Sequence, residues 1–271
     1  AAPYSALTIV STAAWGLGYF GMPHILLRFM AIEDEKKLKL SRRVATIWVV
    51  ISLFVAVFIG VIGYTMSKVG ALEMLTGSNS ETIIVKISAL LSQHGVIFAL
   101  LAGVILAGIL ASTMSTSDSQ LLAASSAVSS DILGAFRKDS SNKNGSMAAA
   151  RITLLVISVV AAFIARNPDS SVFAIVSFAW AGFGAAFGPV VLFSLFWKRT
   201  SKWGALAGMV CGGSMVFIWK YLIRPLGGIW NIYELLPAFL IACAAIVIVS
   251  LLTPKPSKEI EEEFDRVAQM K

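Results

Sequence analysis

Long uncharged, strongly apolar runs alternate along the chain with short polar gaps. A helix needs about 20 apolar residues to cross about 30 Å of hydrocarbon. Runs of that length predict seven spans, at about 4–27, 44–66, 95–117, 147–165, 170–197, 203–222 and 230–253. The third is expected to continue as helix to about residue 132, which is longer than a bilayer requires. The pattern therefore predicts an all-α integral membrane protein.

Two shorter stretches differ from the spans. Between the second and third runs, apolar residues recur at helical spacing over a stretch too short to cross a bilayer, at Ile83, Ile84, Ile87, Leu90 and Leu91. They predict a short amphipathic helix near 81–92 on the external side, either packed on the mouth of the protein or lying in the interface. The acidic end of the tail, 257–271, is expected to be a solvated helix or a disordered segment.

Composition and charge agree with a membrane protein. The chain is 57% hydrophobic and 14% charged, whereas soluble domains carry about a quarter charged residues. Its net charge of +7 does not indicate nucleic acid, because the cations lie in short gaps rather than on one face. Of the 22 Lys and Arg residues, 17 lie in the gaps 28–43, 137–151 and 198–202 and in the tail. The positive-inside rule makes these segments cytoplasmic. The chain is therefore expected to lie in the cell (inner) membrane, with its start on the external side and its end in the cytoplasm.

Several function classes are excluded by what the sequence lacks. Cys211 and Cys243 sit singly in apolar runs, so neither a disulfide nor a metal site is expected of them. HExxH, GxSxG, Walker A and EF-hand patterns do not occur, which argues against an enzyme. The start of the chain has no initiator Met and no basic region before the first apolar run. We therefore expect a fragment rather than a signal peptide.

The first apolar run contains helix-breaking residues at 15–24, with glycines at 16, 18 and 21 and a proline at 23. Glycine favours departure from helical dihedrals and proline removes a donor, so a break into two half-helices is expected here. Broken helices in transporters expose backbone N–H and C=O groups that bind substrate and coupling ions. A simple proline kink relieved by neighbouring helices is the alternative.

A stripe of hydroxyl groups follows one face of the third run. Ser112, Ser115, Thr116 and Ser119 fall at i, i+3, i+4 and i+7. Such oxygens suit a hard cation, and Asp118 beside them could contact a cation or water. The alternative is that the hydroxyls bond to their own i−4 carbonyls or to neighbouring helices.

Small residues also recur at four-residue spacing in the fifth and sixth runs. Gly184 and Gly188, like Gly208 and Gly212, form G-x-x-x-G faces on which backbones can approach closely. In the fifth run a hinge is the alternative to close packing, because Pro189 loosens the helix near its middle.

Three segments together resemble the sodium/solute symporter family, and within it the proline-carrying members. They are residues 15–24, Met-Ser-Thr at 114–116 with Gln-Leu-Leu at 120–122, and residues 179–193. The resemblance implies a LeuT-like inverted-repeat fold. In that fold, 1–197 would form the second five-helix repeat, 198–253 two additional spans and 254–271 a cytoplasmic tail. The first repeat would be a missing N-terminal half.

The resemblance also implies site residues. Positions matching Trp15, Tyr19 and Pro23 contribute to the family's substrate site. His24, at the start of a half-helix, is a minor candidate from the sequence pattern itself.

For the coupling ion, the family's sodium site uses positions matching Ser112, through its carbonyl, Ser115 and Thr116. Some relatives bind a second sodium near positions matching Ser115, Asp118 and Ser119. An acid at 118 suits such a cation or a proton.

These expectations describe a secondary transporter in the lipid bilayer that couples Na⁺ entry to uptake of L-proline by alternating access. Two alternatives remain open. One is a symporter of the same family for another solute, such as a sugar, carboxylate or vitamin. The other is a non-transporting, transporter-like sensor module.

Overall fold

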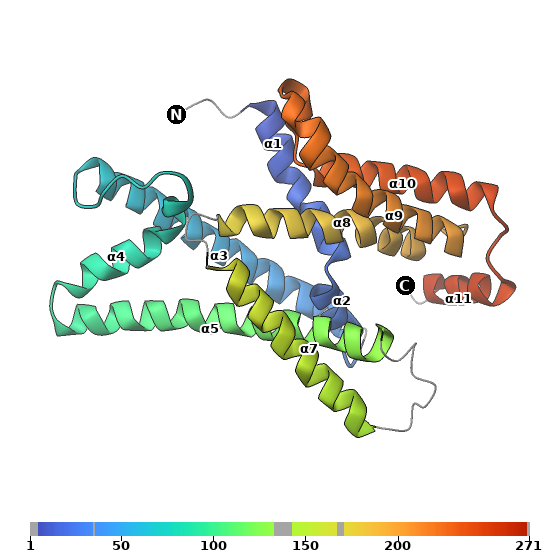
Figure 1. Ribbon diagram of the computed structural model, residues 1–271, viewed down its shortest axis with the longest axis horizontal. Helices are drawn as coiled ribbons and strands as arrows, with labels where there is room; N and C mark the ends of the chain where they lie inside the picture. The colour runs from blue at the N-terminus through green and yellow to red at the C-terminus, as the bar shows by residue number, and fades with distance from the viewer. Residues whose placement is uncertain (1–4, 35, 133–142, 167–170, 270–271) are drawn as a thin grey trace. The chain divides into compact units, whose positions relative to one another are not determined.

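The computed structural model describes residues 5–34, 36–132, 143–166 and 171–269, and the regular secondary structure of these residues is helical, without strands. The chain forms two compact units, one of Ala1–Met30 with Phe173–Lys271 and one of Ala31–Val172 (Figure 1). Six helices of the described residues are long and apolar enough to cross a membrane. They are α3 (Lys37–Lys68), α5 (Val96–Ser126), α7 (Lys143–Ile164), α8 (Val172–Phe196), α9 (Lys202–Ile218) and α10 (Leu235–Leu252). Six of the seven predicted spans are thereby confirmed as helices.

The remaining predicted span, 4–27, is not one helix. It consists of α1 (Ala6–Ala13), the 3₁₀ helix η1 (Ala14–Gly21) and α2 (Pro23–Met30). Each piece has eight residues, so none of them could cross a bilayer alone.

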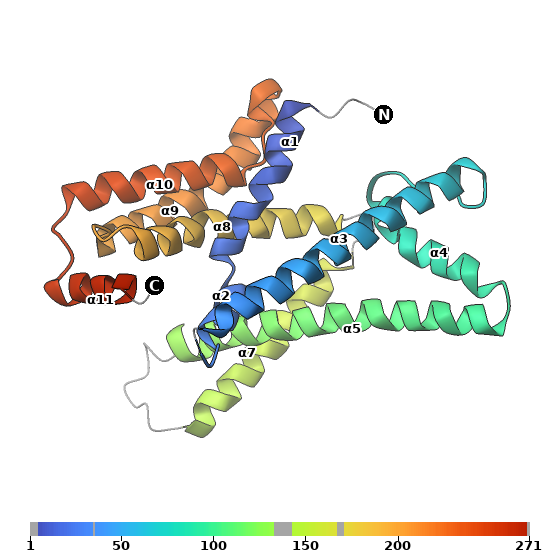
Figure 2. The same ribbon diagram turned by 180° about the vertical axis from the view of Figure 1, so that it is seen from behind.

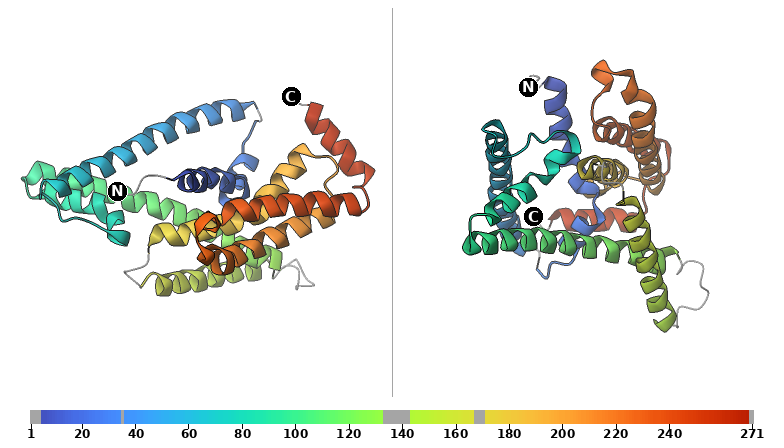
Figure 3. Two further views of the ribbon diagram at one scale, coloured as in Figure 1. Left: turned by 90° about the horizontal axis from the view of Figure 1, so that it is seen from above. Right: turned by 60° about the vertical axis from the view of Figure 1, so that its left-hand side comes forward.

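In the first unit, α9 and α10 run side by side because glycines on α9 let the two backbones approach (Figure 3). A methyl group on Gly208 would lie 2.7 Å from Ile246 Cδ1, and one on Gly212 would lie 2.8 Å from the carbonyl carbon of Ala185 on α8. The predicted close packing is confirmed for this helix. The same core buries Ala185, Val216 and Leu235 completely.

An ion pair closes the connection between α9 and α10. After α9 the chain continues through a π-helix, η4 (Trp219–Ile223), and two 3₁₀ turns, η5 (Arg224–Leu226) and η6 (Gly228–Trp230). Arg224 donates to the Glu234 carboxylate at 2.8 Å and to Asn231 Oδ1 at 3.0 Å. Glu234 is only 2% exposed. Removing Arg224 would leave the buried Glu234 carboxylate without a partner, so the pair is expected to stabilise this connection.

The second unit contains α3, α4 (Ile83–Ser92), α5 and α7, with the 3₁₀ helix η2 (Gly77–Thr82) before α4. The predicted short helix is confirmed as α4, which packs on α3 and α5 (Figure 2). The third predicted span also continues as expected, because α5 leads into the π-helix η3 (Ala127–Ile132).

A surface ion pair ties the loop after α3 to α4. Lys86 Nζ donates to Glu73 Oε1 at 2.7 Å, and this hydrogen bond lowers the pKa of Glu73 below its ordinary value of 4.5. Because the pKa of Glu73 is lowered in the folded state, the ion pair stabilises the loop fully at pH values above 4.5. The stabilisation is lost as the pH falls through the lowered pKa.

We therefore expect hydrogen exchange of the loop amides, corrected for intrinsic rates, to rise as the pH falls below about 4.5. The variant Glu73→Gln should exchange rapidly at every pH and show no step. A step of the same size in that variant would show that another group is responsible.

The tail is a helix, α11 (Lys258–Gln269), rather than a disordered segment, and residues 270–271 lie outside the described residues. Lys198, in the turn between α8 and α9, donates to Asp265 on α11 at 2.5 Å. This hydrogen bond raises the pKa of Lys198. Both side chains are exposed to solvent, so salt is expected to weaken the attachment of α11.

Candidate functional site

The first predicted span is broken within residues 15–24, where the sequence predicted a break. Between η1 and α2, Met22 has extended dihedrals (φ −84°, ψ 114°), and its carbonyl accepts from Ile25 and Leu26 at 3.0 Å. Pro23 is the first residue of α2, a position where the missing N–H removes no helical hydrogen bond. The geometry favours a true break over a simple proline kink. Helix ends leave C=O and N–H groups without helical partners, and the break brings two such ends together.

Glycines bring this break into direct contact with α8. A methyl group on Gly21 would lie 2.8 Å from Gly188 N and 2.9 Å from Gly184 Cα. A methyl group on Gly184 would lie 2.7 Å from Gly18 Cα. The backbones of η1 and α8 therefore touch, which confirms close packing for the G-x-x-x-G face of α8. The helix continues through the buried Pro189 to Phe196.

An aromatic cluster fixes the first half of the broken helix. The Trp15 ring stacks on Phe173, Trp180 and Tyr233, with centroid distances of 5.5, 5.5 and 5.9 Å. Trp180 Nε1 donates to the Trp15 carbonyl at 2.9 Å, and the Tyr233 hydroxyl donates to the Ser177 carbonyl at 2.6 Å. These contacts make Trp15 a well-anchored part of the first unit.

The four predicted substrate residues fall on both sides of the break. Trp15 is half-buried in the cluster, and Tyr19 meets the Trp180 ring edge-on at 4.8 Å while remaining 51% exposed. Pro23 is exposed and His24 half-buried at the start of α2. The structure thus brings Trp15 and Tyr19 together through Trp180. The two later residues stand at the start of the other half-helix.

The sequence analysis named Trp15 alone of this cluster as a functional candidate and missed the other members, among them Trp180 and Tyr233. Trp180 was visible only as part of a family motif, and its proximity to Trp15 comes from the close approach of η1 to α8. Tyr233 precedes α10 and carried no sequence signal at all. Its backbone N–H donates to Ser11 Oγ at 3.1 Å, a contact across 222 residues of chain.

In the second unit, the hydroxyl stripe lies on α5 and is exposed or half-buried along its length. Thr116 Oγ1 donates to the Ser112 carbonyl at 3.2 Å, and Ser119 Oγ donates to the Ser115 carbonyl at 3.0 Å. Two of the hydroxyls therefore bond to their own i−4 carbonyls, as the alternative interpretation expected. An exposed polar stripe on a span is costly against lipid, so this face needs a polar neighbour.

Acidic metal ligands are not part of this stripe. No described group of three or more His, Cys, Asp or Glu side chains could hold a metal ion. Asp118 is exposed, and no ion pair of Asp118 occurs within the described residues. The hydroxyl and carbonyl oxygens of the stripe are hard donors, which suit a hard cation better than a transition metal.

A family model described as the sodium:solute symporter family matches residues 3–212. The chain belongs to this family. The membership confirms the resemblance inferred from the three sequence motifs, which all lie within the matched residues.

Individual symporters of the family are similar to this chain over nearly its whole length. A sodium/proline symporter of Haemophilus influenzae is 41% identical, over 96% of this chain and 51% of its own. An osmoregulated proline transporter of Bacillus subtilis is 39% identical, over 94% of this chain and 50% of its own. The sodium/proline symporter of Escherichia coli is 39% identical, over 95% of this chain and 50% of its own. The chain thus spans about half the length of the curated relatives it matches, and no solved structure matches it.

Proposed function

We propose that this chain is part of a secondary transporter that couples Na⁺ entry to uptake of L-proline by alternating access. The observation that carries the proposal is its 41% identity, over 96% of its length, to a protein named as a sodium/proline symporter. The broken helix and the hydroxyl stripe support it, because both supply backbone and side-chain oxygens at membrane depth. The remaining half of the transporter would lie upstream.

The broken helix suits a zwitterionic substrate. The end of η1 offers carbonyl groups with partial negative charge. At the start of α2, Pro23 has no N–H and the Ile25 and Leu26 N–H groups donate to the Met22 carbonyl, so the His24 N–H is the group that would meet a carboxylate there. Trp15 and Tyr19 add aromatic surface for an apolar ring, next to Pro23 and His24 at the start of α2. Proline has an ammonium, a carboxylate and an apolar ring, so its three chemical features each have a matching group.

Na⁺ would be held on α5 by the Ser112 carbonyl and the Ser115 and Thr116 hydroxyls. The residues fit the ion, because uncharged oxygens can replace its hydration shell and this face is open to further ligands. The remaining oxygens would come from a helix outside this chain. Asp118 and Ser119, the latter half-buried, would serve a second cation or a proton.

The fold and topology follow from the same proposal. Residues 1–197 would form the second repeat of a LeuT-like core, with two additional spans in 198–253. The distribution of Lys and Arg supports an external start and a cytoplasmic tail for this multi-pass cell-membrane protein.

The test is uptake of radiolabelled proline by proteoliposomes that contain the whole transporter. An inward Na⁺ gradient should drive accumulation, and an equal K⁺ gradient should not. Excess unlabelled proline should abolish the signal, whereas sugars, carboxylates and vitamins should leave it unchanged. The proposal would be contradicted by proline uptake that does not depend on Na⁺ or by competition from another solute. It would also be contradicted if none of these solutes were taken up.

A further inference from the structure

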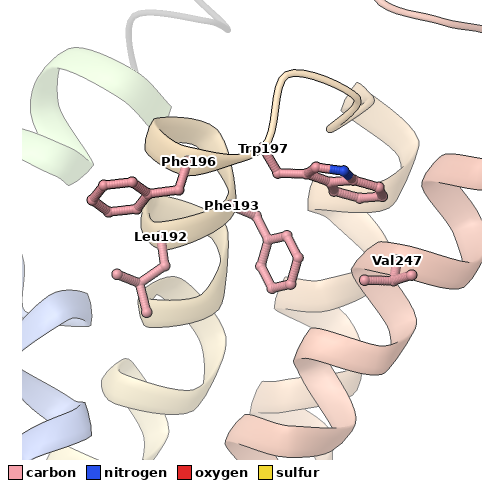
Figure 4. Close-up of a pocket in the computed structure, with 5 residues that line it drawn as sticks. All are labelled: Leu192, Phe193, Phe196, Trp197 and Val247. Carbon is pink, nitrogen blue, oxygen red and sulfur yellow. The ribbon is translucent and has the colours of Figure 1, made fainter. Parts of the chain in front are cut away.

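An apolar groove lies on the first unit at the end of α8. It has a volume of about 590 Å³ and is lined by Leu192, Phe193 and Phe196 of α8, by Trp197 directly after α8 and by Val247 of α10. Figure 4 shows the side chains of Phe193 and Trp197 pointing toward the helix that carries Val247. The rings of Phe193 and Trp197 meet edge-on at 5.6 Å, which sets one wall of the groove. The lining is almost entirely hydrocarbon, so its occupant should be hydrocarbon as well.

A basic turn stands directly at one end of this groove. The Trp197 carbonyl accepts from the N–H of Thr200 at 3.1 Å and from its hydroxyl at 2.8 Å, which folds the turn tightly over Trp197. The turn and the first residue of α9 contribute three cations, Lys198, Arg199 and Lys202.

Much of that positive charge is not compensated. Arg199 donates through Nη2 to the Thr253 carbonyl at 2.8 Å, while its buried Nη1 has no partner among the described residues. Lys202 lies exposed over the Trp203 ring, 5.5 Å from its centroid. Within the described part of the chain, neither cation pairs with an acid. Only Lys198 does, with Asp265 on the exposed helix α11.

We propose that this groove binds an acyl chain of an anionic phospholipid whose phosphate lies against the turn 198–202. A hydrocarbon groove with a cationic end has the two-part chemistry of such a lipid. Trp197 and Trp203 flank the turn at span ends, where tryptophan typically sits at the headgroup level. Basic pockets between spans on the cytoplasmic side hold anionic headgroups, and the positive-inside rule puts this turn on that side. An apolar helix in the groove would leave Lys202 and Arg199 without counter-charge.

The test uses the whole transporter in phosphatidylcholine nanodiscs that contain a phosphatidylglycerol with a photoactivatable group on one acyl chain. Crosslinks should map to peptides containing 192–197 and Val247. Unlabelled phosphatidylglycerol should compete, and unlabelled phosphatidylcholine should not. A phosphatidylcholine probe with the same acyl chain should label these peptides at least about fivefold less, since each cation near the headgroup contributes about that factor.

Two pairs of variants separate the chain site from the headgroup site. Val247→Trp should obstruct the groove and reduce labelling there, whereas Ile248→Trp, at a neighbouring residue that is 56% exposed and does not line the groove, should not. Lys202→Gln should weaken phosphatidylglycerol labelling about fivefold. Lys68→Gln is its matched control, because Lys68 also lies over an aromatic ring, that of Tyr64, at the end of a span, and it does not line the groove.

Three results would overturn the proposal. Equal labelling by the two lipid probes would show a groove that merely contacts bulk lipid. Crosslinks absent from the groove, with the groove instead crosslinked to another segment or a second copy, would show that protein occupies it. Full labelling of the variant Lys202→Gln would show that the headgroup does not bind at the turn. Because Lys202 is exposed, this variant should fold normally, so it tests the proposal even if Val247→Trp fails to fold.

Discussion

Replacing both Ser115 and Thr116 by alanine is expected to raise the Na⁺ concentration for half-maximal proline uptake at least about 100-fold. Each removed hydroxyl deletes one contact to a charged group, and such contacts contribute about 1.5–3 kcal/mol each. Two of them amount to about 3–6 kcal/mol, and 1.4 kcal/mol is a factor of about ten. At ordinary Na⁺ concentrations, uptake by the double variant should therefore fall close to background.

The measurement is the Na⁺ dependence of initial uptake rates in proteoliposomes, with protein amount and melting temperature determined in parallel. Thr113→Ala is the matched control. Thr113 lies on the same turn of α5 but outside the stripe, and its hydroxyl donates to the Ile109 carbonyl at 2.9 Å. This control should keep the Na⁺ dependence of the unaltered protein. The same Na⁺ dependence in the double variant and in the control would show that the ion does not bind to this face of α5.

Gly21→Ala is expected to destabilise the first unit by about 3 kcal/mol, at the upper end of what overpacking normally costs. The added methyl group would meet Gly184 Cα and Gly188 N, at 2.9 and 2.8 Å. Both are backbone atoms and cannot rotate away as a side chain could. The helices must separate, and the break would lose its contact with α8.

The change should appear as a lower melting temperature of the purified protein together with reduced uptake. Gly16→Ala provides the comparison, since no described atom lies within 4 Å of the added carbon there. Alanine at 16 should leave stability nearly unchanged. Equal stability and activity of the two variants would contradict the close backbone contact between η1 and α8.

The spans could be predicted from the sequence because the bilayer imposes a minimum length on every apolar run. That constraint does not act outside the hydrocarbon, and the helix ends there were missed. The α3 helix begins at Lys37, earlier than the apolar run at 44, because helix continues through a lysine-rich turn. The break at Met22 was predictable for a local reason, since glycine and proline act on their own backbone.

Contacts between distant segments were not predictable. Nothing near Tyr233 indicates that its ring stacks on Trp15, because that contact requires α10 and η1 to be placed first. The hydroxyl stripe was found by its periodicity, whereas the bonds that Thr116 and Ser119 make to their own helix depend on rotamers. Periodicity gives the face on which a side chain lies, and it does not give the direction in which the hydroxyl points.

The hydrogen bond from the Thr116 hydroxyl to the Ser112 carbonyl has a consequence for turnover. Both oxygens belong to the proposed ion site, and the bond joins them across 3.2 Å. It uses the hydroxyl proton and one lone pair of the carbonyl, so each oxygen keeps a lone pair that could coordinate a cation. The bond also fixes the direction of those lone pairs before an ion arrives. Binding and release of an ion at the proposed site would therefore need little rearrangement of α5.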